Sequence, residues 1–249
     1  PLTRTHERNE RRMLKIEHLT KTYGEKKAVD DLSLHIAPGE IYGFIGHNGA
    51  GKTTTLKSIA GILRFDEGEI TIDGTSVKND PLACKKKLAY IPDNPDLYEF
   101  MTGIKYLNFI SDIFGVSADD RQARIRKYAD LFELTNDLAQ PIASYSHGMK
   151  QKLAIISAWV HEPRLIIMDE PFVGLDPKAS HLLKGMMREL CDRGGAIFFS
   201  THVLEVAEKL CDKVAIIKAG KLIRSGTMEE VKGDDSLEEV FLELEGESC

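Results

Sequence analysis

The sequence predicts an α/β protein with a mostly parallel main sheet, an N-terminal antiparallel β subdomain and a helical insertion. Three observations predict this fold. In the second half of the chain, apolar runs typical of buried strands alternate with helical or loop sequence. Near the start, apolar and polar positions alternate as in an antiparallel sheet. Residues 94–160 instead carry apolar residues at helical spacing.

The antiparallel part is predicted from segments near the start of the chain. Apolar residues alternate over 14–19 and again over 32–36, the period of a strand with one buried face. Residues 68–72 and 75–77 flank Asp73-Gly74, a dipeptide that favours a hairpin turn. These segments therefore predict an antiparallel sheet beside the main one.

The main sheet is predicted from short apolar runs. The candidate strands are residues 41–45, 88–91, 165–169, 196–200 and 214–217. From Ser236, apolar residues at i, i+3, i+4 and i+7 predict a tail helix, whose apolar face either packs on the domain or serves as an interaction surface. We expect one domain over 13–249, with helical parts at about 94–160 and 227–249, after a tag or upstream extension at 1–12.

Composition narrows the classes of function. With a net charge of −6, the chain is not expected to bind nucleic acid as its main task. No apolar run approaches the length of about 18 residues that a membrane span requires, so the chain itself is not expected to cross a membrane. The four cysteines are scattered, which favours reduced cytosolic thiols over zinc or disulfides.

Residues 46–53, Gly-His-Asn-Gly-Ala-Gly-Lys-Thr, follow one apolar run and open a predicted helix. This is the order of a phosphate-binding loop, and it indicates a P-loop NTPase core. Glycine lets backbone N–H groups approach phosphate oxygens, and the helix N-terminus adds positive potential. Lys52 is predicted to reach the β- and γ-phosphates and the Thr53 hydroxyl to bind Mg²⁺. The predicted nucleotide-binding positions are Gly46, His47, Asn48, Gly49, Ala50, Gly51, Lys52, Thr53 and Thr54.

A second nucleotide signal is an apolar run that ends in two acids, Asp169 and Glu170. An acid at the end of a buried strand can hold the Mg²⁺ shell, which we assign to Asp169. Glu170 can orient and polarise the attacking water. Elsewhere, Ser146 is predicted to cap a helix, and Gly148 leaves backbone open in its first turn. Taken alone, that helix is better explained by ordinary capping.

Six motifs in order resemble those of the nucleotide-binding subunit of an ATP-binding cassette (ABC) transporter. Besides the two nucleotide signals, Tyr23 is similar to the family's adenine-stacking aromatic, and residues 145–149 stand where its signature segment lies. Residues 174–176 match the loop through which two subunits communicate, and His202 matches the switch histidine. The resemblance covers nearly everything after residue 13.

The resemblance implies a composite ATP site. Lys52, Thr53, Asp169, Glu170 and His202 of one subunit hold ATP·Mg²⁺, and the catalytic residues are Glu170, His202 and Lys52. Ser146 and the amides around Gly148 of the opposite subunit close on the γ-phosphate. The opposite subunit is a second copy or a paralogous ATPase. A separate transmembrane permease is the other implied partner, which places this chain in the cytoplasm, on the inner face of the cell membrane.

The sequence departs from the family pattern at three positions. Asp93 stands where the family has a metal-contacting glutamine, and it is the third expected metal residue, with Thr53 and Asp169. His147 and Met149 replace a glycine and a glutamine of the signature; we expect His147 to fill space rather than donate to a phosphate.

These variants resemble a bacterial branch of exporters for drugs, peptides and lipid-linked substrates. The resemblance implies a groove for the permease's cytoplasmic coupling helix. Its lining residues would be Leu97, Tyr98, Phe100 and Met101, although an apolar cluster after a loop is as often core.

Other classes of nucleotide-binding protein are distinguished by particular residues. A GTPase needs Asn-Lys-x-Asp, and no asparagine here precedes a lysine. A small-molecule kinase lacks the signature segment and the switch histidine. A regulatory module without turnover would lack Glu170 or His202. A soluble cassette ATPase in a non-transport role remains the alternative; such proteins usually carry two cassettes or a long coiled coil, and neither pattern is present.

Overall fold

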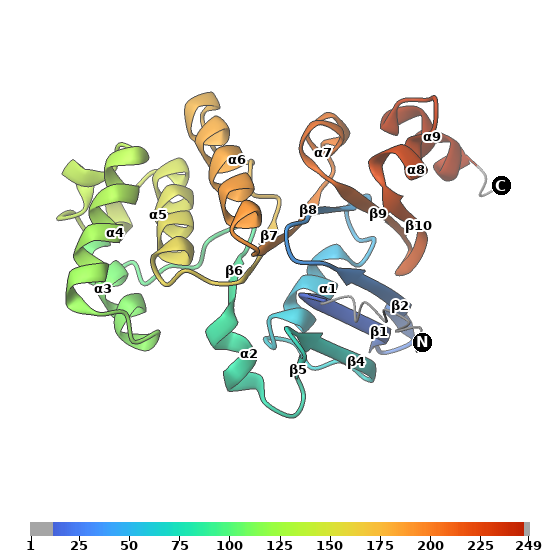
Figure 1. The fold of residues 1–249 in the computed structure, drawn as a ribbon, viewed down its shortest axis with the longest axis horizontal. Helices are drawn as coiled ribbons and strands as arrows, with labels where there is room; N and C mark the ends of the chain where they lie inside the picture. Colours follow the sequence, from blue (N-terminus) through green and yellow to red (C-terminus); the bar gives the residue numbers. More distant parts are fainter. Residues whose placement is uncertain (1–11, 247–249) are drawn as a thin grey trace, which may run out of the picture.

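The structure is a computed structural model and describes residues 12–246. Their strands form two sheets, and a group of helices lies beside the sheets, drawn in green and yellow in Figure 1. The predicted α/β class, with a mostly parallel sheet, an antiparallel subdomain and a helical insertion, is confirmed. Residues 1–11 of the predicted extension lie outside the described residues. Between residues 12 and 246, every helix is too short or too polar to pass through a bilayer.

The smaller sheet is antiparallel, in the order β2-β1-β4-β5. Its strands are β1 (Leu14–Tyr23), β2 (Lys26–Ile36), β4 (Glu67–Ile72) and β5 (Thr75–Ser76). On the central strand, Leu14 pairs with Ile36 on one side and with Ile72 on the other. Asp73 and Gly74, both at positive φ, turn the predicted hairpin between β4 and β5.

The main sheet has the order β10-β9-β3-β8-β7-β6. Its strands are β3 (Ile41–Ile45), β6 (Leu88–Ile91), β7 (Leu165–Asp169), β8 (Ala196–Thr201), β9 (Lys213–Lys218) and β10 (Lys221–Thr227). All neighbours pair in parallel except β10, which runs antiparallel to β9. The strand β3 therefore lies in the centre, between β8 and β9, and its carboxyl end opens at the middle of the sheet.

Both faces of the main sheet are covered, as its continuous apolar runs predict. Along β7, Ile167 faces a core shared with the small sheet and helix α1 (Lys52–Ile59), whereas Ile166 faces a core built with helices on the other side. The helix α1 thus lies between the two sheets. Its N-terminus meets the carboxyl end of β3, which is where the phosphate loop was predicted.

Four of the five α-helices on the second face begin at a side-chain cap, among them the predicted cap Ser146. The five are α3 (Gly103–Ile113), α4 (Ala118–Leu131), α5 (His147–Val160), α6 (Pro177–Asp192) and α7 (Leu204–Leu210), with short 3-10 turns η1 (Thr135–Asp137) and η2 (Ile142–Ser144). Thr102, Ser117, Ser146 and Asp176 each accept a hydrogen bond from an N–H of the helix that they precede. Helices α3 and α4 pack on α5, forming the helical group at the left of Figure 1.

Two elements lie outside the sequence-based predictions: α2 (Pro81–Lys87) and β10. The seven-residue α2 is capped by Asp80, which accepts from the Ala83 N–H at 3.0 Å. The predicted helical tail contains α8 (Met228–Lys232) and α9 (Leu237–Gly246). Leu237, Val240 and Phe241 are buried, so this face packs on the domain, one of the two expected alternatives. Residues 247–249 are not described.

Candidate functional site

The phosphate loop joins the end of β3 to the start of α1, and at two of its positions the backbone is packed too closely for a side chain. A Cβ added at Gly46 would lie 2.5 Å from the carbonyl oxygen of Ile217. At Gly51, whose φ is +109°, it would lie 2.4 Å from the carbonyl oxygen of Ala28. Both positions therefore require glycine. The loop is fixed from behind by β9 and β2, and its front faces a cleft.

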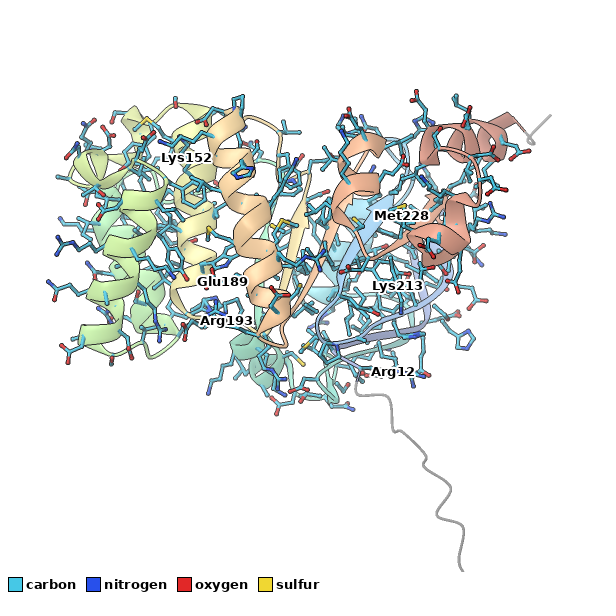
Figure 2. The ribbon with its side chains drawn as sticks, turned by 45° about the horizontal axis from the view of Figure 1, so that its top comes forward. Arg12, Lys152, Glu189, Arg193, Lys213 and Met228 are labelled. Carbon is cyan, nitrogen blue, oxygen red and sulfur yellow. The ribbon has the colours of Figure 1, made fainter. Side chains whose placement is uncertain are left out.

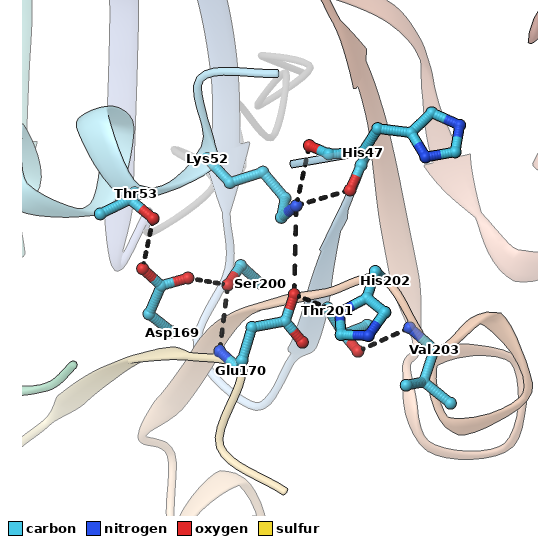
Figure 3. Close-up of polar contacts among 10 residues, drawn as sticks. His47, Lys52, Thr53, Asp169, Glu170, Ser200, Thr201, His202 and Val203 are labelled. Carbon is cyan, nitrogen blue, oxygen red and sulfur yellow. Dashed lines mark hydrogen bonds and ion pairs between the residues drawn. The ribbon is translucent and has the colours of Figure 1, made fainter. Parts of the chain in front are cut away.

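Lys52, the first residue of α1, is 6% exposed, and its ammonium group lies inside the curve of the loop. Its Nζ donates to the carbonyl oxygens of Gly46 at 2.5 Å and His47 at 3.1 Å, and lies 4.0 Å from Glu170 Oε1 (Figure 3). Burial lowers the pKa of Lys52, while the charges of Glu170 and Asp169 act in the opposite direction. The ammonium group is thus partly desolvated and faces the inside of the loop.

Asp169 ends β7, directly opposite Ser200 on β8 in the sheet register. Its carboxylate accepts hydrogen bonds from the Ser200 hydroxyl and, at 2.5 Å, from the Thr53 hydroxyl (Figure 3). Ser200 was not among the predicted site residues. Its signal was its place two residues before His202, at the end of a strand.

Glu170 follows β7 with a φ of +46°, a left-handed conformation that is uncommon for a glutamate. Its N–H lies 3.2 Å from both the backbone oxygen and the hydroxyl of Ser200. Its Oε1 is buried, 2.8 Å from His202 Nδ1, but neither His202 nor Lys52 meets it with hydrogen-bond alignment. A buried carboxylate oxygen without an aligned donor is costly. It is therefore well placed to accept a hydrogen bond from a molecule in the cleft.

A cleft of about 310 Å³ brings most of the predicted site residues together. Its lining includes Tyr23, His47, Asn48, Gly49, Gly51, Lys52, Thr53, Thr54, Asp93, Asp169 and Glu170. Gly46 and Ala50 lie behind this wall, and His202 reaches the cleft through Glu170. Lys26 and Ala28 also line it and were not identified from the sequence. Tyr23 is 52% exposed, so part of this cleft-lining side chain is accessible to a ligand.

The oxygen atoms beside Lys52 suit a hard divalent cation. The Thr53 hydroxyl and the Asp169 carboxylate are already within 2.5 Å of each other, and Asp93 lines the same cleft. Hydroxyl and carboxylate oxygens are ligands that Mg²⁺ accepts, usually together with phosphate oxygens and water. Among residues 12–246, no cluster of three or more His, Cys, Asp or Glu side chains forms a metal cage. The donor set therefore fits a cation that is shared with a phosphate ligand.

Ser146 and Gly148 lie outside the residues that line this cleft. They open α5, where the Ser146 hydroxyl accepts from the Met149 N–H at 3.2 Å. A Cβ at Gly174 would lie 2.5 Å from the imidazole of His147, and one at Gly148 would lie 3.0 Å from the Gly174 oxygen. His147 thus fills space against the loop at 174–176. Within one chain, the start of α5 is therefore not part of the cleft that Lys52 lines.

The same loop is tied to α5 by charge. Lys152 Nζ lies 2.8 Å from Asp176, which also accepts from the Ala179 N–H at 2.8 Å. The Lys152 hydrogen bond, and then that N–H, lower the pKa of Asp176. Lys152 lies toward the start of α6, opposite the end that carries Arg193 (Figure 2). The signature segment and the 174–176 loop therefore form one packed unit.

An aromatic cluster follows β6 and lies apart from the cleft. Phe100 is 83% exposed and Tyr98 47% exposed, with ring centroids 5.8 Å apart. Tyr98 also contacts Phe109 of α3, at 5.7 Å. Leu97 is buried in the core and Met101 is partly buried against it, so these two are core residues rather than exposed surface. The exposed part of the predicted groove is the Tyr98–Phe100 pair.

The chain is similar in sequence to known ATP-binding proteins of ABC transporters. The family model described as "ABC transporter" matches residues 29–173. The ABC-type transporter ATP-binding protein EcsA of Bacillus subtilis is 35% identical over 242 residues, which are 95% of this chain and 98% of EcsA. The Nod factor export ATP-binding protein I of Paraburkholderia xenovorans is 36% identical, over 86% of this chain and 70% of that protein.

Solved structures agree with these sequence matches. An ATP-binding subunit of an ABC transporter superposes with a TM-score of 0.90 at 35% identity, covering 94% of this chain and 99% of that one. A dimeric ATP-binding cassette in a post-hydrolysis state, bound to ADP and Pi, superposes with a TM-score of 0.79 at 25% identity. That comparison covers 87% of this chain and 99% of the other.

Proposed function

The chain belongs to the ABC transporter family, and from this premise we propose how its residues bind and hydrolyse ATP. It is an ATP-binding and ATP-hydrolysing subunit. The observation that supports the residue roles is the cleft in which Lys52, Thr53, Asp169 and Glu170 meet. Together these side chains offer a cation for phosphate, oxygens for a metal and a base for water.

In the proposed mechanism, the phosphates enter the loop and Lys52 exchanges its bonds to the Gly46 and His47 oxygens for bonds to phosphate oxygens. The loop amides donate to the same phosphates. Glu170 Oε1 accepts a proton from the attacking water, which it also orients. His202, at 2.8 Å, positions Glu170. No covalent intermediate on the protein is needed, so most of the rate acceleration comes from positioning the reactants and from charge stabilisation.

Thr53 and Asp169, with Asp93 at the edge, are the residues proposed to hold Mg²⁺. When bound, the ion neutralises charge that develops on the phosphate oxygens. The observation behind this proposal is the pair of hard oxygens at 2.5 Å next to Lys52. Ser200 has a supporting part, because its hydroxyl holds the other Asp169 oxygen in place.

We further propose that Ser146 and the amides at Gly148 act in the cleft of a second subunit. Both open the N-terminus of α5, where a capped helix end favours an anion. They do not line the chain's own cleft, so a γ-phosphate contact requires another copy or a paralogue. Closing and reopening such a dimer is the proposed mechanical output.

The permease is proposed to be a separate chain and the transport direction to be export. The Nod factor export relative supports the direction. Through that permease, the subunit would lie on the inner face of the cell membrane. The test is co-purification from detergent-solubilised membranes, with ATP turnover measured on the captured complex. Recovery of only soluble partners would favour the non-transport alternative.

Replacing Tyr23 tests the adenine contact. Tyr23→Ala is expected to weaken ATP binding by about 5- to 150-fold, because stacking of a base on an aromatic ring contributes about 1–3 kcal/mol. Calorimetry with ATP measures this loss, and melting temperature checks that the fold is intact. Tyr98→Ala removes a tyrosine of similar exposure outside the cleft and should leave the affinity unchanged. Equal affinities for Tyr23→Ala and wild type would show that adenine stacks elsewhere.

Replacing Phe100 tests the permease contact. Truncating an exposed aromatic side chain that anchors an interface typically weakens the binding free energy by more than about 1 kcal/mol. Phe100→Ala should therefore retain about ten-fold less of the co-purifying membrane protein than the wild type does. ATP affinity should stay at the wild-type value. Ile223→Ala, on exposed β10, is the matched control and should retain the partner fully. Full retention by Phe100→Ala would contradict the assignment.

A further inference from the structure

The side chain of His47 lies outside the ATP cleft proper, although its carbonyl group is part of it. The carbonyl oxygen accepts from Lys52 Nζ at 3.1 Å. In Figure 3 the imidazole ring points away from Lys52, toward the C-terminal part of the chain. There it meets the ring of Phe241, with centroids 4.9 Å apart and the ring planes at 62°. An edge-to-face contact of this kind is a specific aromatic geometry.

Phe241 belongs to α9, which is held by apolar packing and by hydrogen bonds. Leu237 and Val240 are buried against the domain, and the Leu237 N–H lies 3.3 Å from Glu208 of α7. Lys218, the last residue of β9, donates to the Leu244 carbonyl oxygen at 3.0 Å. Figure 1 shows α9 beside α7 at the far right of the fold. A helix held in this way can provide a rigid contact to the loop.

The part of the loop that Phe241 contacts is its exposed tip. His47, Asn48 and Gly49 are exposed, whereas the flanking Gly46 and Ala50 are buried. The buried flanks are supported by the β9–β10 turn: the Gly220 N–H donates to the Ala50 oxygen at 2.9 Å. The exposed tip gains a packing partner from α9, and this tip carries the carbonyl oxygen to which Lys52 is bonded.

We propose that Phe241 is a positioning residue for ATP: by packing on the His47 ring, it holds the phosphate loop in the shape that binds the phosphates. The C-terminal helix thereby acts on nucleotide affinity without touching the nucleotide. This inference rests on the proposed ATP site. It predicts an effect on ATP binding rather than on the chemical step, because Phe241 packs on the phosphate loop, whereas the proposed base is Glu170.

The test is a double-mutant cycle in the full chain, with ATP affinity measured by calorimetry. Phe241→Ala is expected to raise the Kd for ATP by about three- to ten-fold, the range of one aromatic pair. Phe241→Tyr keeps the ring and should stay within two-fold of wild type. In a His47→Ala background, Phe241→Ala should have no further effect, since its partner is already gone. In turnover, KM should rise while kcat stays within two-fold.

Two further variants distinguish an effect on the shape of the phosphate loop from a general loss of stability. Phe241→Leu keeps most of the apolar volume, so the melting temperature should stay near wild type while the Kd still rises. Leu242→Ala, an exposed neighbour on the same helix, should bind ATP like wild type. An unchanged Kd in Phe241→Leu, or an equal loss with and without His47, would overturn the inference. Failure of the wild-type chain to bind ATP would overturn the proposed function, and this inference with it.

Discussion

Glu170→Gln should bind ATP with near wild-type affinity and lose turnover by about 10²- to 10⁴-fold, the range expected when a general base is removed. The amide keeps the shape of the side chain but cannot accept the proton of the attacking water. Because the nucleotide then stays intact, we also expect ATP to hold two subunits together. Steady-state phosphate release and size-exclusion chromatography with and without ATP measure the two effects.

The matched control for this variant is Glu205→Gln. Glu205 is an exposed carboxylate on nearby α7 that pairs with Lys209, outside the cleft. Its replacement should leave turnover and assembly unchanged. Wild-type turnover in Glu170→Gln would remove this residue from the mechanism. A chain that is fully active as a strict monomer would contradict the composite site, whereas the phosphate loop would retain its assignment.

Lys52→Ala is expected to weaken ATP binding by at least about 10²-fold, because it removes charge-assisted hydrogen bonds to phosphate of about 1.5–3 kcal/mol each. The melting temperature of the variant should stay close to that of the wild type. Burial already disfavours the charged form of Lys52. Its hydrogen bonds go to backbone carbonyl oxygens, and water can donate to these oxygens once the lysine is removed. Calorimetry measures the affinity and thermal melting the stability.

Lys57→Ala provides the comparison, as a lysine in the last turn of the same helix that does not line the cleft. Its ATP affinity should stay within two-fold of wild type. If Lys52→Ala bound ATP as tightly as Lys57→Ala, the loop amides alone would account for phosphate binding. The role given to the ammonium group would then be wrong.

The elements that were predicted correctly carry strong local signals. β7 is a continuous apolar run, and Asp73-Gly74 fixes its own turn through backbone conformation. The helix α2 was not predicted, because seven residues ending in three lysines show no apolar period. β10 was not predicted either: it is largely exposed and owes its conformation to hydrogen bonds with β9, which a local pattern cannot reveal.

The sequence predicts which residue types form the site better than it predicts how they are arranged. Lys52 and Asp169 follow from motif chemistry, and their meeting in one cleft follows from parallel strands that end at the same edge. Ser200 was missed because its role depends on register with Asp169, not on its own neighbours. The ring contact between His47 and Phe241 joins distant parts of the chain, and nothing local in the sequence indicates it.

The packing of α5 on the 174–176 loop has a consequence for how two nucleotides are handled. Lys152 joins the helix that we propose to act in the neighbouring subunit's cleft to a loop that follows this subunit's own Glu170. In the proposed dimer, a change at one nucleotide would displace groups that touch the other. ATP consumption should then be cooperative, with a Hill coefficient above one, and Lys152→Ala should bring it closer to independent sites.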